Sequence, residues 1–379
     1  MNYQSIELEP IPGVPLRTHR DAWRVTLETD IPVQGKALEY SKIRFEHLLR
    51  LENLRVISMS GPIGNLDDLI GFLASHPNVE QLFWTRSNIE SFDAADTHLS
   101  ILTLGSNRLK RVSIPPTLER LSIACRAPVS NCIEVTTPPS HSLRQLSVGS
   151  DLDRVDFLHK IIGIESVHEL FISNDKCFDI AHVSCFFPRI QKLSLHGRKD
   201  FVSELRGLDS LKEFADLREL ELFNIYDFCV RNLLDACASA SIRKLTVMCA
   251  FRDVSNEINR LKSEYRFEIE NVWPKDRKAF YRSLTNPFGM WESQIDKKFA
   301  QRACEAYVKC KARIDSSKAK GELAGLDVLR EFIDTFNDMI ANIDSIRREE
   351  VCDVFSELAN QAGYSTEEAS KLLDQWRDF

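Results

Sequence analysis

The sequence contains no long hydrophobic run and no excess of basic residues. No stretch approaches the roughly 18 consecutive apolar residues that a membrane-spanning helix needs, and the first 21 residues lack the basic segment and apolar run of a secretory signal. These absences predict a cytoplasmic protein whose ten cysteines are reduced rather than paired in disulfides. A formal net charge of -7 at pH 7 argues against general nucleic-acid binding, which requires a basic surface.

The common sequence signatures of catalysis are also missing. We find no HExxH motif, no pair of CxxC motifs, no nucleophile elbow and no phosphate-binding loop. We therefore predict that the protein is not an enzyme and binds no cofactor. Cys177, His182 and Cys185 carry side chains that suit zinc. A fourth ligand is not evident, however, and the apolar residues between them predict a buried loop rather than a metal site.

What the sequence does contain is a recurring pattern of apolar residues. The stretch from Leu99 to Leu109 has the spacing L-x-x-L-x-L-x-x-N-x-L, with Asn107 in the gap. The first part of this spacing, L-x-x-L-x-L with other apolar residues allowed in place of leucine, is the repeat frame. It occurs nine times, and its first apolar residue, the anchor, is Leu54, Val79, Leu99, Leu118, Leu143, Val167, Ile190, Leu217 or Ile242. Successive anchors lie about 19 to 27 residues apart, a period typical of repeat proteins.

The recurring frame resembles the leucine-rich repeat superfamily over roughly residues 45 to 272. The resemblance implies an α/β solenoid with a parallel sheet on its concave side and helices or loops on its convex side. We expect an N-terminal cap at 1–45, a solenoid of about nine to ten repeats at 46–274, and a helical C-terminal domain at 275–379. Three- and four-residue apolar spacing predicts convex-side helices at 65–77, 151–162, 227–239 and 254–265, and looser structure is expected at 125–142.

The C-terminal domain has a helical pattern without the repeat frame. An apolar seam at three- and four-residue steps runs from Leu326 to Ile343, a loop is expected at 316–325, and Ser365 with Glu368 predicts a capping box. Residues 275–321 hold twelve Lys or Arg against five acids, whereas 322–379 hold five against fourteen. We expect these opposite charges to complement each other within the domain; the alternative is that the acidic half meets a basic partner.

A cysteine-dependent enzyme is the sharpest catalytic alternative. Some bacterial effector ubiquitin ligases resemble this chain in joining leucine-rich repeats to a helical domain, and they use a Cys-x-Asp nucleophile. Here Cys304 is followed by Glu305 and Ala306, and Cys352 by Asp353 and Val354, so neither matches. Cys352 shares a helical face with Phe355 and Ala359, which predicts a cysteine of the helical core.

The outward-facing positions of the predicted strands form the candidate binding surface. Ser or Thr fills the second outward position in six of the nine repeats, which suits crowded parallel strands without any ligand. Aromatic and charged residues at the other positions are typical of binding anchors. We predict that the partner-binding residues are Phe83, Thr103, Arg120, Gln145, Glu169, Phe171, Lys192, Glu219, Glu221 and Lys244.

These patterns favour a noncatalytic scaffold that binds another protein on its concave face. One specific form is a cytosolic protein that neutralises a toxin or effector by occluding it, as bacterial immunity proteins do. The alternative is a substrate adaptor of a larger complex, and the cysteine-dependent ligase is the third. The sequence leaves open whether the concave face or the acidic helices carry the site, but it predicts no nucleic-acid, membrane or metal partner.

Overall fold

The computed structural model divides the chain into two compact units, Met1–Trp273 and Pro274–Phe379. It describes residues 5–11, 14–19, 21–28, 43–125, 132–150, 161–164, 166–175, 177–198, 201–293, 295–320, 325–340 and 343–378. In this part of the chain, no helix is both long and apolar enough to cross a membrane.

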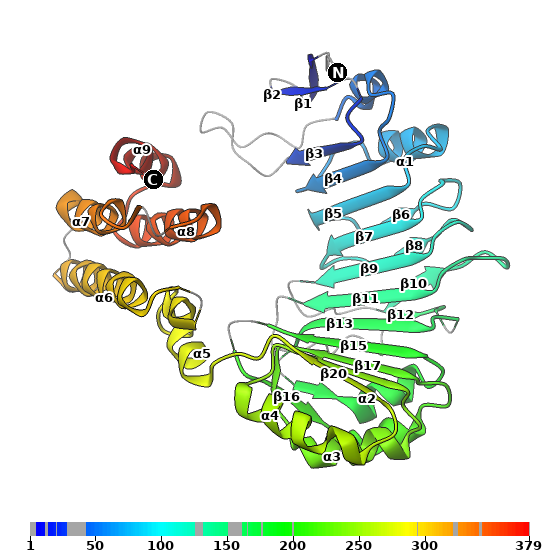
Figure 1. Ribbon diagram of the computed structural model, residues 1–379. Coiled ribbons are helices and arrows are strands. Elements are labelled where there is room, and N and C mark those ends of the chain that lie inside the picture. Colours follow the sequence, from blue (N-terminus) through cyan, green and yellow to red (C-terminus); the bar gives the residue numbers. More distant parts are fainter. Residues whose placement is uncertain are drawn as a thin grey trace. The chain divides into compact units, whose positions relative to one another are not determined.

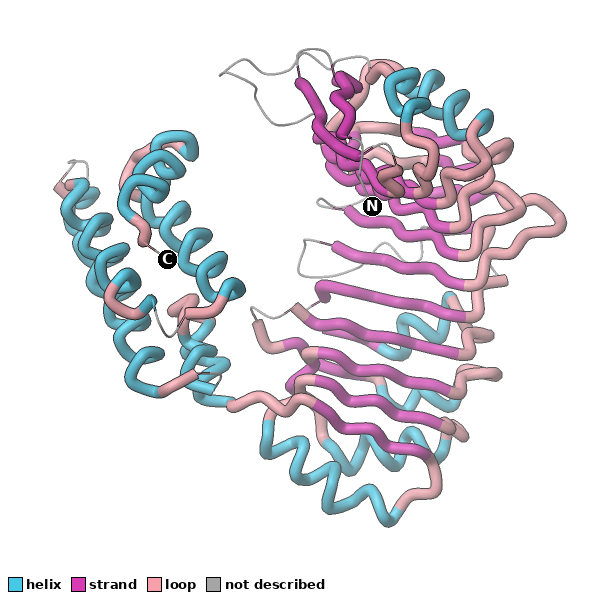
Figure 2. The backbone as a smooth tube through the Cα atoms, turned by 45° about the horizontal axis from the view of Figure 1, so that its top comes forward, coloured by secondary structure: helices cyan, strands magenta, loops and turns pink. Residues whose placement is uncertain are grey.

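The first unit is built around one sheet of eleven parallel strands, in which each strand pairs with the next along the chain (Figure 1). The strands are β3 (Arg24–Glu28), β4 (Val56–Ser60), β5 (Gln81–Ser87), β7 (Ile101–Ser106), β9 (Arg120–Cys125), β11 (Gln145–Ser150), β13 (Glu169–Asp175), β15 (Lys192–Gly197), β17 (Glu219–Phe223), β19 (Lys244–Met248) and β20 (Glu268–Val272). Figure 2 shows them as a continuous ladder. This confirms the predicted α/β fold class and is compatible with a leucine-rich-repeat-like solenoid.

The recurring leucines explain this stacking. Leu102 and Leu104 on β7 are fully buried, and Leu102 pairs in register with Leu82 on one side and Leu121 on the other. Alternate residues of a strand point to opposite faces, so Thr103 between them lies on the other face. We call that other face the open face of the sheet. One strand cannot bury its leucines alone, and each repeat therefore depends on its neighbours.

The segments between the main strands form helices and short strands. The helices are α1 (Leu66–Ser75), α2 (Ile180–Phe186), α3 (Val230–Ser239) and α4 (Arg252–Leu261), with 3-10 turns at η1 (Phe45–Arg50), η3 (Leu208–Glu213) and η4 (Lys262–Glu264). The short strands form two parallel sheets, one of β6 (Ser91–Asp93), β8 (Arg111–Ser113), β10 (Ile133–Thr136) and β12 (Ile161–Ile162), the other of β14 (Cys177–Asp179), β16 (Ser203–Arg206) and β18 (Ile225–Asp227). The helices predicted within 65–77, 227–239 and 254–265 are confirmed.

The short strands correct two expectations. The looser segment expected at 125–142 contains β10, because Ile133 and Val135 alternate inward and pair with the neighbouring short strands. The helix expected at 151–162 lies outside the described residues up to 160, and its last two residues form β12 instead.

The N-terminal residues contribute three strands. β1 (Ser5–Ile11) and β2 (Val14–His19) form an antiparallel hairpin. β3 extends the main sheet by pairing in parallel with β4, and its Val25 and Leu27 are buried. The leucine-lined interior therefore continues into the region expected to be a cap.

The second unit consists of α5 (Arg277–Ser283), the 3-10 turn η5 (Gly289–Ser293), α6 (Lys297–Ala319), α7 (Leu326–Asn337), α8 (Ser345–Gln361) and α9 (Thr366–Trp376). Its core includes Phe288, Trp291, Phe332, Phe336 and Phe355. The predicted capping box of Ser365 and Glu368 begins α9.

Two predictions about this unit were too simple. The loop expected at 316–325 begins later, since α6 continues to Ala319 and no glycine interrupts it before Gly321. The apolar seam does not form one continuous helix face. α7 ends at Asn337, and Ile340 beyond it is 39% exposed.

Candidate functional site

The predicted partner-binding residues lie in two aligned columns across the open face. Register pairs each outward residue with its counterparts on the neighbouring strands. The first column contains Gln81, Ile101, Arg120, Gln145, Glu169, Lys192, Glu219, Lys244 and Glu268, and the second contains Phe83, Thr103, Ser122, Ser147, Phe171, Ser194, Glu221, Thr246 and Glu270. Neighbouring residues in a column lie on strands about 4.8 Å apart, so each column is a continuous line of side chains across the sheet. Their binding role stays a prediction.

The two phenylalanines singled out from the sequence have different surroundings. Both are half-buried rather than fully exposed. Phe83 lies near the start of the sheet, where the guanidinium of Arg24 is 6.0 Å from its ring centroid. Phe171 lies on β13 and belongs to an aromatic cluster that crosses three strands.

This aromatic cluster joins Phe171, His196 and Phe223. The His196 ring is centred 4.3 Å from Phe171 and 4.9 Å from Phe223. Burial lowers the pKa of His196 below its ordinary value of 6.5, although the nearby Glu221 carboxylate acts in the opposite direction. His196 and Phe223 lie one outward position beyond the two predicted columns, because β15 and β17 extend past the third apolar residue of the frame. The alternation of the strand was the signal that could have found them.

A charged cluster adjoins the aromatic one. Lys192 Nζ lies 3.9 Å from Glu219 and 3.6 Å from Glu221, and Lys244 Nζ lies 3.3 Å from Glu268 and 3.2 Å from Glu270. Hydrogen bonds to Glu270 and Glu268 raise the pKa of Lys244. These contacts are partly exposed, so they contribute little to stability and instead define the charge of the face.

Glu221 links the two clusters, but the arrangement is not a catalytic triad. Ser194 Oγ donates to Glu221 Oε2 at 3.2 Å, and His196 Nε2 lies 3.3 Å from Glu221 Oε1. In a triad the histidine lies between the serine and the carboxylate, where it removes the serine proton. Here the carboxylate lies between serine and histidine, so His196 is not placed to activate Ser194.

A pocket of about 320 Å³ occupies the end of the open face. It is lined by Lys192, Glu219, Leu220, Glu221, Lys244, Thr246, Met248, Glu270, Val272 and Trp273. Trp273 follows β20 and is 68% exposed. The pocket thus joins the charged cluster to an apolar margin. Of the residues that line it, four were predicted from the sequence to bind a partner: Lys192, Glu219, Glu221 and Lys244.

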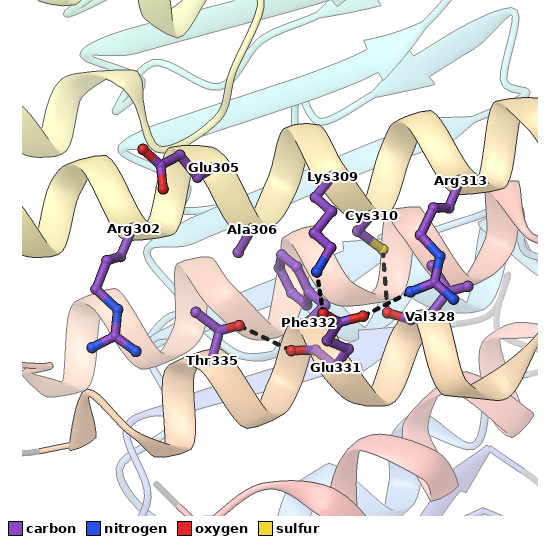
Figure 3. A pocket seen from close by; sticks show the side chains of 10 residues that line it. All are labelled: Arg302, Glu305, Ala306, Lys309, Cys310, Arg313, Val328, Glu331, Phe332 and Thr335. Carbon is purple, nitrogen blue, oxygen red and sulfur yellow. Dashed lines mark hydrogen bonds and ion pairs between the residues drawn. The ribbon is translucent and has the colours of Figure 1, made fainter.

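A second pocket, of about 270 Å³, lies between α6 and α7 in the helical unit (Figure 3). Lys309 forms an ion pair with Glu331, and Arg313 donates to Glu331 at 2.7 Å and to Asp327 at 2.6 Å. The hydrogen bond from Lys309 lowers the pKa of Glu331. The basic α6 and the acidic α7 therefore pair with each other, which supports the expected charge complementarity within this unit.

The cysteines differ in part from expectation. Cys352 was predicted to be a core residue, but it is half-buried at the margin of the helical core, as is Cys304. Cys352 Sγ lies 3.5 Å from the Arg377 guanidinium. Of the three cysteines in the helical unit, Cys310 is buried. Its thiol donates to the Val328 carbonyl, and burial raises its pKa to about 11, which disfavours the reactive thiolate.

The segment containing Cys177, His182 and Cys185 is not a buried loop. It consists of β14 followed by α2, and Cys185 is exposed on that short helix. Within the described ranges, no three His, Cys, Asp or Glu side chains are grouped so that they suit a metal ion.

Comparison with known proteins gave no match, either among protein-family models or among curated proteins.

Proposed function

We propose that this protein is a noncatalytic leucine-rich repeat scaffold that binds another protein on the open face of its parallel sheet. The observation that carries the proposal is the juxtaposition of the Phe171–His196–Phe223 cluster and the Lys192 and Glu221 ion pair on neighbouring strands. Aromatic anchors beside charged groups are typical of interface hot spots. A sheet held by buried leucines also presents these groups with little conformational entropy to lose on binding.

The form of binding that we favour is neutralisation by occlusion. In this proposal a cytosolic protein covers the active surface of a toxin or effector, and the rows of side chains on the open face supply a broad contact area. The alternative is an adaptor whose helical unit joins a larger complex while the sheet holds a substrate. An adjacent toxin gene would favour neutralisation over the adaptor.

The proposal is tested by isolating the partner and measuring its affinity for defined variants. A pull-down from native extract followed by mass spectrometry identifies the partner, and calorimetry then measures binding. We expect Phe171→Ala to weaken binding by at least about 1 kcal/mol, because it removes an aromatic anchor. Ser147→Ala is the matched control on the same column and should change little. Charge reversal at Glu219 and Glu221 should act mainly on the association rate and its salt dependence.

A different pattern of binding by these variants would contradict the proposal. If these variants all bind normally, while deletion of residues 275–379 abolishes binding in a repeat unit that remains folded, the site belongs to the helical unit. The open face would then have only a structural role.

A further inference from the structure

We propose that the pocket at the β17–β20 end of the open face receives an arginine side chain from the partner protein. This inference rests on the proposed function and specifies the chemistry of the partner. It stands on three features of the pocket: an excess of negative charge, a small floor between two carboxylates, and an apolar margin that ends in an exposed tryptophan.

The charge of the pocket favours a cation. Four carboxylates, those of Glu219, Glu221, Glu268 and Glu270, share the two ammonium groups of Lys192 and Lys244. Glu268 lies outside the pocket lining, so the three carboxylates that line the pocket exceed the two ammonium groups by one negative charge. His196, the other basic group beside Glu221, is held toward its neutral form by burial. An incoming cation therefore meets carboxylates that the protein has only partly neutralised.

The register places two of these carboxylates on either side of a small residue. Glu221 pairs with Thr246, and Thr246 pairs with Glu270, so the three are neighbours in the second column, on β17, β19 and β20. The outer two strands are separated by about two strand spacings, or roughly 9.6 Å. Thr246 leaves space above the sheet between them. The Glu221 carboxylate already contacts Ser194, His196 and Lys192 on β15, and the Glu270 carboxylate pairs with Lys244. A planar guanidinium that enters the space above Thr246 adds further donors to these two shared carboxylates.

The next outward position along these three strands supplies an apolar surface for the aliphatic part of the arginine side chain. Phe223, Met248 and Val272 are paired across the same three strands, and Trp273 follows Val272. Met248, Val272 and Trp273 line the pocket. Arginine packs its methylene stem on apolar groups while its charged end remains in a polar environment, and its guanidinium stacks favourably on indole rings. The volume of about 320 Å³ lies at the lower end of the range for ligand pockets and has room for one long side chain.

The test uses the full-length chain and a blocked peptide, acetyl-Leu-Arg-Leu-amide. Indole NMR resonances report binding, and Trp273→Phe identifies the Trp273 signal. We expect a saturable shift of this signal, and an affinity at least about tenfold weaker for the peptide in which neutral citrulline replaces arginine. Glu221→Gln with Glu270→Gln should weaken the arginine peptide by a similar factor, and Glu270→Gln alone should do so in part. Glu134→Gln, on strand β10 of another sheet, is the matched control and should have no effect.

Two results would overturn the inference: no saturable shift of the Trp273 signal, or equal affinity for the arginine and citrulline peptides. The natural partner separates this inference from the proposed function. If Phe171→Ala weakens that partner while Glu221→Gln with Glu270→Gln does not, only the arginine pocket is wrong. If the partner is insensitive to every change on the open face, the proposed function is wrong as well.

Discussion

At the scale of single residues, His196 is the group whose environment has the clearest measurable consequence. It lies between two phenyl rings, with Glu221 and Lys192 as its charged neighbours. Because burial lowers its pKa, the folded state binds the proton less tightly than the unfolded chain does. The contribution of neutral His196 to the free energy of unfolding is therefore fully present above its unfolded pKa of about 6.5, and it is lost as the pH falls toward its folded pKa.

We expect the free energy of unfolding to fall between about pH 7.5 and pH 5.5, and to fall less steeply in His196→Gln, which cannot be protonated. Urea unfolding followed by circular dichroism at several pH values measures this difference. His98→Gln, a change of an exposed histidine, is the control. A slope that His196→Gln leaves unchanged would mean that burial of His196 has no thermodynamic effect.

At the scale of secondary structure, the start of α9 depends on reciprocal hydrogen bonds. Ser365 Oγ accepts from the Glu368 amide at 3.3 Å, and the Ser365 amide donates to Glu368 Oε2 at 2.8 Å. We expect Ser365→Ala to destabilise the first turn of α9 by about 1 kcal/mol, because a helical amide loses its partner. Amide hydrogen exchange across α9 measures this loss.

The control for this change is Ser370→Ala, an exposed position within the same helix. The bonds from Ser365 also lower the pKa of Glu368. The contribution of that carboxylate is therefore present above its unfolded pKa and disappears in acid, so the difference between wild type and Ser365→Ala should shrink at low pH. A Ser365→Ala protein with wild-type exchange at neutral pH would contradict the role of the capping box.

At the scale of the whole molecule, each of the two units has its own buried core. Leu220 is stacked between Leu193 and Leu245 in the sheet, and Phe336 is fully buried in the helical unit. We expect Leu220→Ala to cost roughly 2 to 5 kcal/mol and Phe336→Ala about 3 to 5 kcal/mol, since each leaves a cavity. Hydrogen exchange should show the loss of protection mainly in the unit that carries the change. An equal loss in both units would mean that they unfold as one cooperative body.

The sequence by itself determined the parallel sheet and the positions that face outward. Each repeat buries leucines at the same fixed spacing, and this spacing can be recognised within a single repeat. Leu102 and Leu220 therefore predict their strands without knowledge of the rest of the chain. Alternation along each strand then places Phe171, Lys192 and Glu221 on the opposite face. The capping box of Ser365 was predictable for the same reason, because its partners are three residues apart.

Only the tertiary structure decided which outward residues come together. His196 and Phe223 join Phe171 because β15 and β17 continue beyond the repeat frame, and strand length depends on pairing with neighbours. Trp273 reaches the pocket margin because β20 pairs in register with β19. Contacts between residues distant along the chain depend on register and on the ends of strands. A spacing pattern within one repeat does not contain that information.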